Sequence, residues 1–146
     1  MCFGFYFGLS PVYATDSWLV GGAIQLVSLC RCNAVTKYIY TILSNPTSPD
    51  DEETYNTWYD GTHLHDALDI RGFVSAQRYR VPDEFAEAAT WRYLAIYTID
   101  TEDIAGTLAE LMDRVDTDAM VISPSIDRDN AHSAPFAPWG PLVTAD

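Results

Sequence analysis

Two stretches of the chain are apolar at both odd and even positions. Lys37–Leu43 and Thr90–Ile99 are rich in β-branched and aromatic side chains and contain no glycine or proline. Such runs are typical of strands, and apolar side chains on both faces indicate a strand that is covered on both sides. We therefore expect these two stretches to lie in the middle of a sheet.

Two further stretches have patterns that favour strands at the edges of that sheet. Phe73–Val81 alternates, and one of its faces is predicted to carry Phe73, Ser75, Gln77 and Tyr79. Arg78 and Arg80 share the other face, which indicates a strand near an edge. Ser133–Val143 combines apolar side chains with several prolines and a glycine, and proline is tolerated in edge strands. It is predicted to be an irregular edge strand.

Two helices are predicted between these strands. The first runs from Pro49 to Ile70, because Ser48 suits the N-cap and proline suits the first helical position. Gly61 weakens this helix by about 1 kcal/mol relative to alanine and is the place for a kink or a break. The second helix begins at Thr101, its predicted cap. Its apolar positions form one stripe for core packing: Ile104, Leu108, Leu111, Met112 and Val115.

The resulting order is β-α-β-β-α-β, the ferredoxin-like plan. It predicts an α+β domain over residues 36–146 with a four-stranded antiparallel sheet. Residues 82–89 are predicted to form a loop, with or without a helical turn. The chain is expected to become irregular from Asp116 onward.

Charge narrows the range of partners. The chain has 146 residues, with 21 acidic and 8 basic side chains and a net charge of −13. Nucleic acids and anionic membrane surfaces are bound by clusters of lysine and arginine, so neither is expected here. The sequence has no apolar run of the roughly 18 residues that a membrane-spanning helix needs.

The first part of the chain differs from the rest. Residues 1–36 carry one basic and one acidic side chain, and they contain all three cysteines of the sequence, Cys2, Cys30 and Cys32. This segment has no basic residue ahead of its apolar stretch, unlike a secretory signal. We interpret residues 1–35 as a poorly structured or non-native extension, with translation starting near Val35. A body free of cysteine fits the cytoplasm, which is the predicted location.

The densest group of chemically active side chains lies in the first predicted helix. Tyr55, Tyr59, His63 and Asp66 follow one another at helical spacing and would share one stripe. His63 is suited to move protons near neutral pH, with Asp66 or Asp60 orienting its ring and Tyr59 donating a hydrogen bond to a substrate oxygen. The alternative is that these aromatic side chains only pack the helix onto the sheet.

The sequence gives little support for a metal site, a phosphate-binding loop or a nucleophilic serine or cysteine. His63 and His65 are two positions apart and do not face each other on a helix, so no metal site is predicted. The chain has no glycine-rich phosphate loop, no G-x-S-x-G motif and no cysteine in its body. We therefore expect no cofactor.

Residues 58–66 (WYDGTHLHD), followed by residues 72–79 (GFVSAQRY), resemble a motif of small dimeric α/β-barrel proteins. That motif is W-Y-x-x-x-H-x-x-D, followed by P-G-F-x-x-x-x-R-Y, and it occurs in the EthD-like group and its uncharacterised bacterial relatives. Residues 93–97 (YLAIY) and 138–141 (PWGP) are similar to that group as well. Arg71 and His65 depart from the pattern, because relatives often have proline at both positions.

The resemblance implies a homodimer in which two four-stranded sheets pack face to face to form a dimeric α/β barrel. It also implies an aromatic pocket in each subunit, with His63 as the acid/base residue and Trp58, Tyr59 and Asp66 beside it. Further residues predicted to bind substrate are Tyr40, Tyr97 and Arg78. Arg78 would hold a substrate carboxylate, and the alternative is that it forms an ion pair at the surface or in the dimer.

Similar folds include cofactor-free lyases, isomerases, cyclases and monooxygenases, as well as proteins without established activity, so the fold alone does not fix the function. The sequence favours a cofactor-independent enzyme that performs acid/base chemistry on a small apolar or aromatic molecule. The alternative is a non-catalytic binding or stress-associated protein with the same pocket. A purely structural dimer is a third reading.

Overall fold

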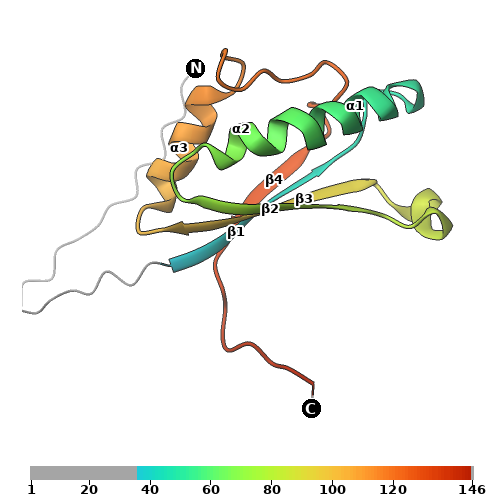
Figure 1. Cartoon of the computed structure of the whole chain (residues 1–146). Coiled ribbons are helices and arrows are strands. Elements are labelled where there is room, and N and C mark those ends of the chain that lie inside the picture. Colours follow the sequence, from blue (N-terminus) through green and yellow to red (C-terminus); the bar gives the residue numbers. More distant parts are fainter. Residues whose placement is uncertain (1–35, 146) are drawn as a thin grey trace, which may run out of the picture. The chain divides into compact units, whose positions relative to one another are not determined.

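The computed structural model describes residues 36–145, which form a four-stranded sheet with helices on one face (Figure 1). The interpretation of residues 1–35 lies outside the described residues. The elements, in chain order, are β1 (Thr36–Ser44), the 3-10 helix η1 (Pro49–Asp51), α1 (Glu52–Trp58), the π-helical turn η2 (Tyr59–His63), α2 (Leu64–Leu68), β2 (Phe73–Arg80), the 3-10 helix η3 (Asp83–Ala88), β3 (Tyr93–Thr101), α3 (Ile104–Arg114) and β4 (His132–Phe136). Within residues 36–145, no helix has the length and hydropathy needed to cross a bilayer.

The strand order confirms the predicted fold. The sheet runs β2-β3-β1-β4, and every neighbouring pair is antiparallel. β1 and β3 are central and β2 and β4 are the edges, as the sequence pattern predicts. With one helical segment after β1 and another after β3, the chain has the β-α-β-β-α-β order of a ferredoxin-like domain.

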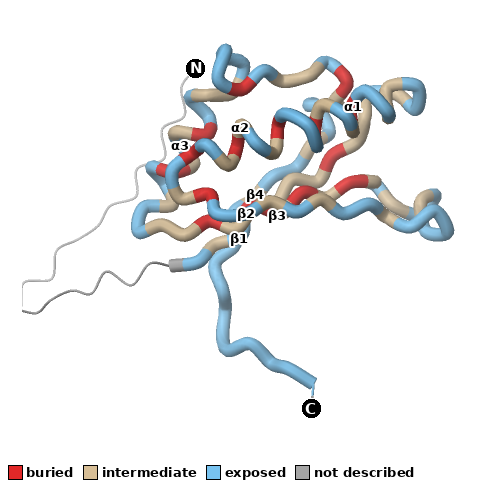
Figure 2. The backbone as a smooth tube through the Cα atoms, in the orientation of Figure 1, coloured by how far each residue is buried: buried red, intermediate tan, exposed pale blue. Residues whose placement is uncertain are grey.

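The core lies between the sheet and the helices and is unusually rich in tyrosine (Figure 2). β3 directs Tyr93, Ala95, Tyr97 and Ile99 toward the helices, and all four are buried. Tyr55 and Tyr59 of the first helical segment are also buried and meet these strand residues. Because each buried tyrosine brings a hydroxyl with it, this core carries polar atoms that need partners.

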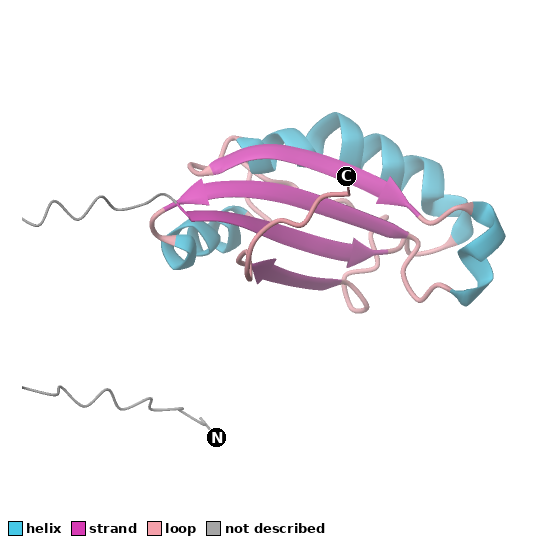
Figure 3. Ribbon diagram, turned by 90° about the horizontal axis from the view of Figure 1, so that it is seen from below, coloured by secondary structure: helices cyan, strands magenta, loops and turns pink. Residues whose placement is uncertain are grey.

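No helix of residues 36–145 covers the opposite face of the sheet (Figure 3); we call it the open face. Strand register pairs Ile39 with Thr98, Thr41 with Ile96 and Leu43 with Leu94 on this face. β4 adds Phe136, which is 52% exposed, and β2 adds Tyr79, which is 51% exposed. The open face therefore presents apolar side chains that the described residues leave partly uncovered.

The predicted faces of β2 are wrong at its first residue. A β-bulge between Phe73 and Ser75 shifts the register, so Phe73 is buried on the helix side while Ser75 is exposed. The extra residue, Val74, is 57% exposed. Bulges place two residues of one strand opposite one residue of the other, and simple alternation misses this change of face.

The first helix does not break at Gly61. Residues 52–68 form one continuous helix whose middle turn, Tyr59–His63, is π-helical. The backbone N–H of Leu64 donates to the carbonyl oxygen of Tyr59, five residues earlier. A π turn holds one more residue than an α turn, so the side chains that follow it are rotated around the axis relative to an ideal α-helix.

Ser48 occupies the predicted N-cap position, ahead of η1, whereas the predicted cap of the second helix is wrong. Asp103, rather than Thr101, caps α3, because its carboxylate accepts a hydrogen bond from the Gly106 N–H at 2.9 Å. Ser48 makes no capping bond to the backbone and donates instead to the Asp51 carboxylate at 2.6 Å. An Asp side chain is as good a cap as Thr or Ser, so sequence alone did not separate the candidates.

The second central strand begins later than predicted, at Tyr93. The side-chain amide of Asn45 accepts from the Arg92 N–H at 2.7 Å and donates to the Thr90 carbonyl at 2.9 Å. These bonds take the place of strand pairing for residues 90–92. β4 is likewise shorter than the predicted edge strand, because pairing with β1 ends at Phe136.

We expect Gly72→Ala to destabilise the protein by about 1–2 kcal/mol, because Gly72 has φ of +101° and a Cβ there would lie 3.4 Å from the Thr107 hydroxyl oxygen. Gly61→Ala is the matched control. It lies in the helix with nothing within 4 Å of the new Cβ, so it is expected to stabilise by about 0.5–1 kcal/mol. Urea denaturation of both variants measures the difference, and two shifts of the same sign would contradict the assignment.

Candidate functional site

An apolar pocket of about 170 Å³ lies between the first helix, α3 and the segment that follows α3. Four of the residues predicted for the site line it: Tyr40, Trp58, Tyr59 and His63. Leu111 and Met112 of α3, with Val115 directly after it, form the opposite wall. An apolar cavity of about 150 Å³ is large enough for a benzene-sized molecule, so this pocket suits a small ring.

His63 is a buried titratable residue in the wall of this pocket. Its side chain is buried at 7% exposure and stacks on Trp58, with ring centroids 4.7 Å apart and planes inclined by 25°. Tyr59 presents its ring edge-on at 5.0 Å. Burial, aided by the nearby Arg78 cation, lowers the pKa of His63 from 6.5 to about 4. The imidazole is therefore neutral at pH 7, and it is a weaker base than an exposed histidine.

The predicted pairing of His63 with a carboxylate is absent. The buried Nδ1 of His63 has no hydrogen-bond partner among the described residues. Asp60 bonds to Arg78 instead, at 2.7 Å. Asp66 lies beyond the π turn, where the extra residue changes the helical spacing that predicted the shared stripe. The structure thus gives His63 an aromatic setting rather than an acid–base dyad.

Arg78 does not face a pocket for a substrate carboxylate. Its side chain is only 10% exposed and lies between the helix and the sheet. The guanidinium donates to the carboxylate of Asp60 at 2.7 Å and to the side-chain oxygen of Asn56 at 2.8 Å. Its carbon lies 4.4 Å from the ring centre of Tyr59 and 5.1 Å from that of Tyr55, within the range of cation–π contacts. Arg78 therefore organises the aromatic core beside the pocket.

The two predicted tyrosines of the central strands have different positions. Tyr40 lines the pocket, whereas Tyr97 is buried behind it at 1% exposure. The hydroxyl oxygens of Tyr97 and Tyr59 are both buried without a hydrogen-bond partner of good geometry. Burial, together with the neighbouring phenols, raises the pKa of Tyr59 well above its ordinary value. In this conformation Tyr59 offers its ring, rather than its hydroxyl, to a molecule in the pocket.

The segment after α3 supplies walls that sequence reasoning missed. Met120, Ile122 and Ile126 line the pocket, and Met120 is completely buried. The segment is fixed by a hydrogen bond from the Trp58 indole N–H to the Val121 carbonyl at 3.1 Å and by backbone bonds to residues 45–47. The apolar run MVI at residues 120–122 was the available signal. This run has neither strand nor helix periodicity, so the sequence did not predict that it packs against the first helix.

Arg128 is a second residue that the sequence did not single out. It lines the pocket, and its two terminal nitrogens bind both carboxylate oxygens of Asp116 at 2.9 and 2.8 Å. Asp116 adopts φ of +64°, a conformation uncommon outside glycine. Arg128 is about half exposed, so this charged pair borders the pocket at the surface.

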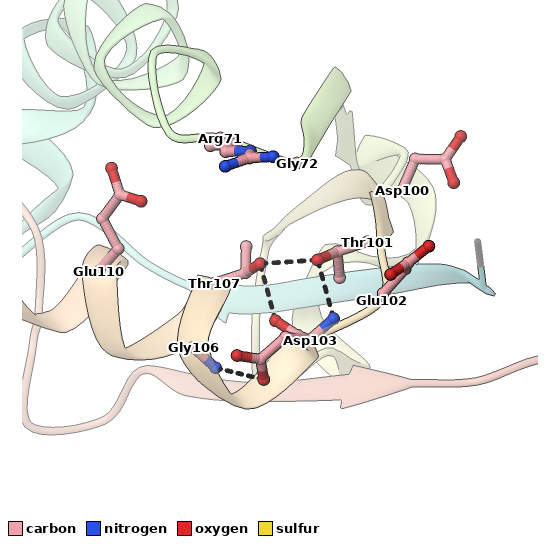
Figure 4. A pocket seen from close by; sticks show the side chains of 9 residues that line it. All are labelled: Arg71, Gly72, Asp100, Thr101, Glu102, Asp103, Gly106, Thr107 and Glu110. Carbon is pink, nitrogen blue, oxygen red and sulfur yellow. Dashed lines mark hydrogen bonds between the residues drawn. The ribbon is translucent and has the colours of Figure 1, made fainter. Parts of the chain in front are cut away.

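A larger cleft of about 510 Å³ lies at the other end of α3 (Figure 4). Most of its lining residues are polar or charged, and two of them, Asp103 and Thr107, make hydrogen bonds that stabilise the start of α3. Asp103 caps α3, and the Thr107 hydroxyl donates to the Asp103 carbonyl and lies 3.1 Å from the Thr101 hydroxyl. Among residues 36–145, no three His, Cys, Asp or Glu side chains are grouped to hold a metal ion. We therefore place the candidate site in the apolar pocket.

No protein-family model matches the chain, and no curated protein sequence matches it. A candidate monooxygenase of Shewanella loihica PV-4 has a similar structure, with 14% identity, coverage of 75% of this chain and 98% of that chain, and a TM-score of 0.47. A dimeric ferredoxin-like protein from an uncultured marine organism has 12% identity, coverage of 77% and 96%, and a TM-score of 0.47.

A monooxygenase of Streptomyces coelicolor, solved with nanaomycin D, has 13% identity, coverage of 77% and 95%, and a TM-score of 0.36. The strand order of this chain defines its ferredoxin-like fold independently of these similarities, which leave its function open. None of the three descriptions names the EthD-like group, so that resemblance stays a prediction.

Proposed function

We propose that this protein binds a small apolar or aromatic molecule in the pocket between the first helix and α3. The observation that carries the proposal is a neutral, buried imidazole in the wall of an otherwise mostly apolar pocket. Apolar walls with few polar groups are the usual composition of small-molecule sites. The flat rings of Trp58 and Tyr59 beside His63 suit a planar ligand.

We further propose that the protein is an enzyme that needs no cofactor and uses His63 as its proton acceptor. A neutral imidazole beside a bound ligand can take a proton from a C–H or O–H group that is acidic enough for a weak base, and can return it at another position. This is the chemistry of lyases, isomerases and cyclases.

The alternative is a binding protein without turnover. One observation favours it: no carboxylate orients the His63 ring. Catalytic histidines are commonly held in one tautomer by a hydrogen bond to their second nitrogen. Both readings use the same pocket and differ in whether the imidazole exchanges protons with the ligand.

The dimeric α/β barrel is also part of the proposal. The open face carries apolar side chains and lies opposite the helices, as a sheet-to-sheet contact would require. Burying this face against a second copy would remove exposed Ile39, Tyr79 and Phe136 from water. We take this homodimer, rather than the isolated chain, as the functional unit, and the cytoplasm remains its predicted location.

A thermal-shift screen with phenols, aromatic acids, aromatic aldehydes and small lactones tests binding. A ligand at 100 times its dissociation constant is expected to add about 2.7 kcal/mol to the stability of the protein. His63→Gln should abolish or reduce the shift, whereas His65→Gln should not, because His65 is exposed and lies outside the pocket. Ala131→Leu, which fills the pocket, should abolish it.

Proton exchange separates the two readings. Each compound that gives a shift is incubated with the protein in D2O, and deuterium incorporation at its C–H positions is followed by NMR. Incorporation that depends on His63 supports an enzyme, and a stability shift without incorporation supports a binding protein. A folded protein that responds to no compound in any class would contradict both.

A further inference from the structure

The last described residues of the chain form an extended apolar segment, Ala137–Ala145, which we call the C-terminal arm. It leaves β4 on the side of the sheet opposite the helices (Figures 1 and 3). Trp139 is 100% exposed, Leu142 is 91% exposed and Val143 is 86% exposed. Side chains of this kind gain free energy when they leave water, and these three have no cover within residues 36–145.

The arm carries no charge, and the charges on the β1 and β3 positions of the open face cancel. The arm contains no acidic or basic side chain. On the open face, the strand positions that pair across β1 and β3 include Lys37 opposite Asp100, whose charges cancel, and otherwise uncharged residues. The chain as a whole has a net charge of −13. Its neutral surface is therefore where a second, equally acidic copy can approach without repulsion.

We infer that two copies of this chain exchange their C-terminal arms, so that Trp139 of each copy packs on the open face of the other. The inference rests on the proposed homodimer and adds to it the element that fastens the two copies. A hollow of about 300 Å³ on the open face is lined by Ile39, Thr98 and Phe136 and is bordered by Ala137 and Pro138, the first residues of the same chain's arm. It has room for a large side chain at the place where the arm leaves the sheet.

The dimensions of the arm are sufficient for this contact. Nine extended residues span up to about 30 Å, whereas a sheet of four strands is roughly 14 Å from first to last strand. Pro138 and Pro141 restrict the backbone on both sides of Trp139 and Gly140. A segment that is already restricted loses less conformational entropy when it docks, so a short arm is able to contribute measurably to dimer stability.

Photo-crosslinking in the full-length chain tests the exchange. Trp139→p-benzoylphenylalanine is made in ¹⁴N and ¹⁵N forms, which are mixed, equilibrated and irradiated. We expect covalent dimers that contain one light and one heavy chain, with the crosslink in the peptides of β1, β2 or β3. The matched control, Phe85→p-benzoylphenylalanine, carries the same group on η3 at a side chain that is 63% exposed, and it should give no covalent dimer.

Analytical ultracentrifugation of alanine variants measures how much Trp139 contributes to the stability of the dimer. Trp139→Ala is expected to raise the dissociation constant of the dimer at least tenfold, whereas Phe85→Ala should leave it unchanged. Because Trp139 is fully exposed, its removal does not disturb the fold of the single chain. Crosslinks confined to one chain, or a dimer that is indifferent to Trp139, would overturn the arm exchange and leave the dimer standing. A monomer at all concentrations would overturn both, while ligand binding in the pocket is tested separately.

Discussion

Between pH 6.5 and pH 4, the native protein is expected to lose about 3 kcal/mol of unfolding free energy through His63 alone. Burial and the Arg78 cation lower the pKa of His63 to about 4 in the folded chain, against 6.5 for an exposed histidine. Between these two pKa values, His63 is protonated in the unfolded chain but neutral in the folded chain. Stability from this group is therefore complete above pH 6.5 and is lost as the pH falls toward 4.

Urea denaturation of the wild type and of His63→Gln, repeated from pH 7.5 down to pH 4, isolates the effect. The many carboxylates titrate in both proteins, so the difference between the two curves reports His63. We expect this difference to change by about 3 kcal/mol across the window. His65→Gln serves as control, because His65 is exposed and should give a curve parallel to wild type. Parallel curves for His63→Gln would show that this imidazole titrates normally.

The low pKa of His63 also sets the acid limit of the pH range in which the proposed enzyme is active. A proton acceptor must be neutral before it acts, and His63 with a pKa of about 4 stays neutral from pH 5 upward. Any activity that depends on it should therefore not decline on the acid side until well below pH 6. A loss of activity centred near pH 6.5 would point to an exposed histidine instead.

Strand identity was readable from sequence because burial on both faces leaves a strong local pattern. β1 and β3 are central, and their runs of β-branched and aromatic residues have no breaker. Register within β2 was not readable, since the bulge after Phe73 depends on how the strand meets β3 and not on any residue that marks it. The π turn at Tyr59–His63 is similar. Gly61 marked the place, but the pattern did not distinguish a kink from an inserted residue.

The π turn also accounts for part of what the site prediction missed. His63, Trp58 and Tyr59 lie together because they are close in sequence on one helix, so local spacing was sufficient. Asp66 depended on continued α-helical spacing across the π turn. Arg78 lies on the predicted face of β2, but its partners Asp60 and Asn56 come from the helix and were not predicted. The wall formed by Met120, Ile122 and Ile126 comes from a segment without periodicity, whose position is fixed by distant backbone bonds.

Arg78→Ala is expected to destabilise the protein by about 3 kcal/mol, more than any ordinary surface charge. The guanidinium lies over the rings of Tyr55, Tyr59 and Tyr93, and contacts of this kind contribute about 0.5–2 kcal/mol when shielded from water. Alanine also leaves a void where the buried arginine stem was packed. Asp60→Ala removes the ion pair alone and should cost less than about 1 kcal/mol, because Asp60 is 61% exposed.

Arg78 also couples the core to the proposed proton acceptor. Since its charge is the smaller of the two causes that lower the pKa of His63, Arg78→Ala should raise that pKa only part of the way from about 4 toward 6.5. Histidine ring resonances followed by NMR during a pH titration measure the shift directly. Arg78→Lys keeps the charge but loses the planar fork that binds Asp60 and Asn56. It should therefore lose stability while leaving the pKa of His63 close to wild type. If both substitutions raise the pKa equally, packing rather than charge controls the imidazole.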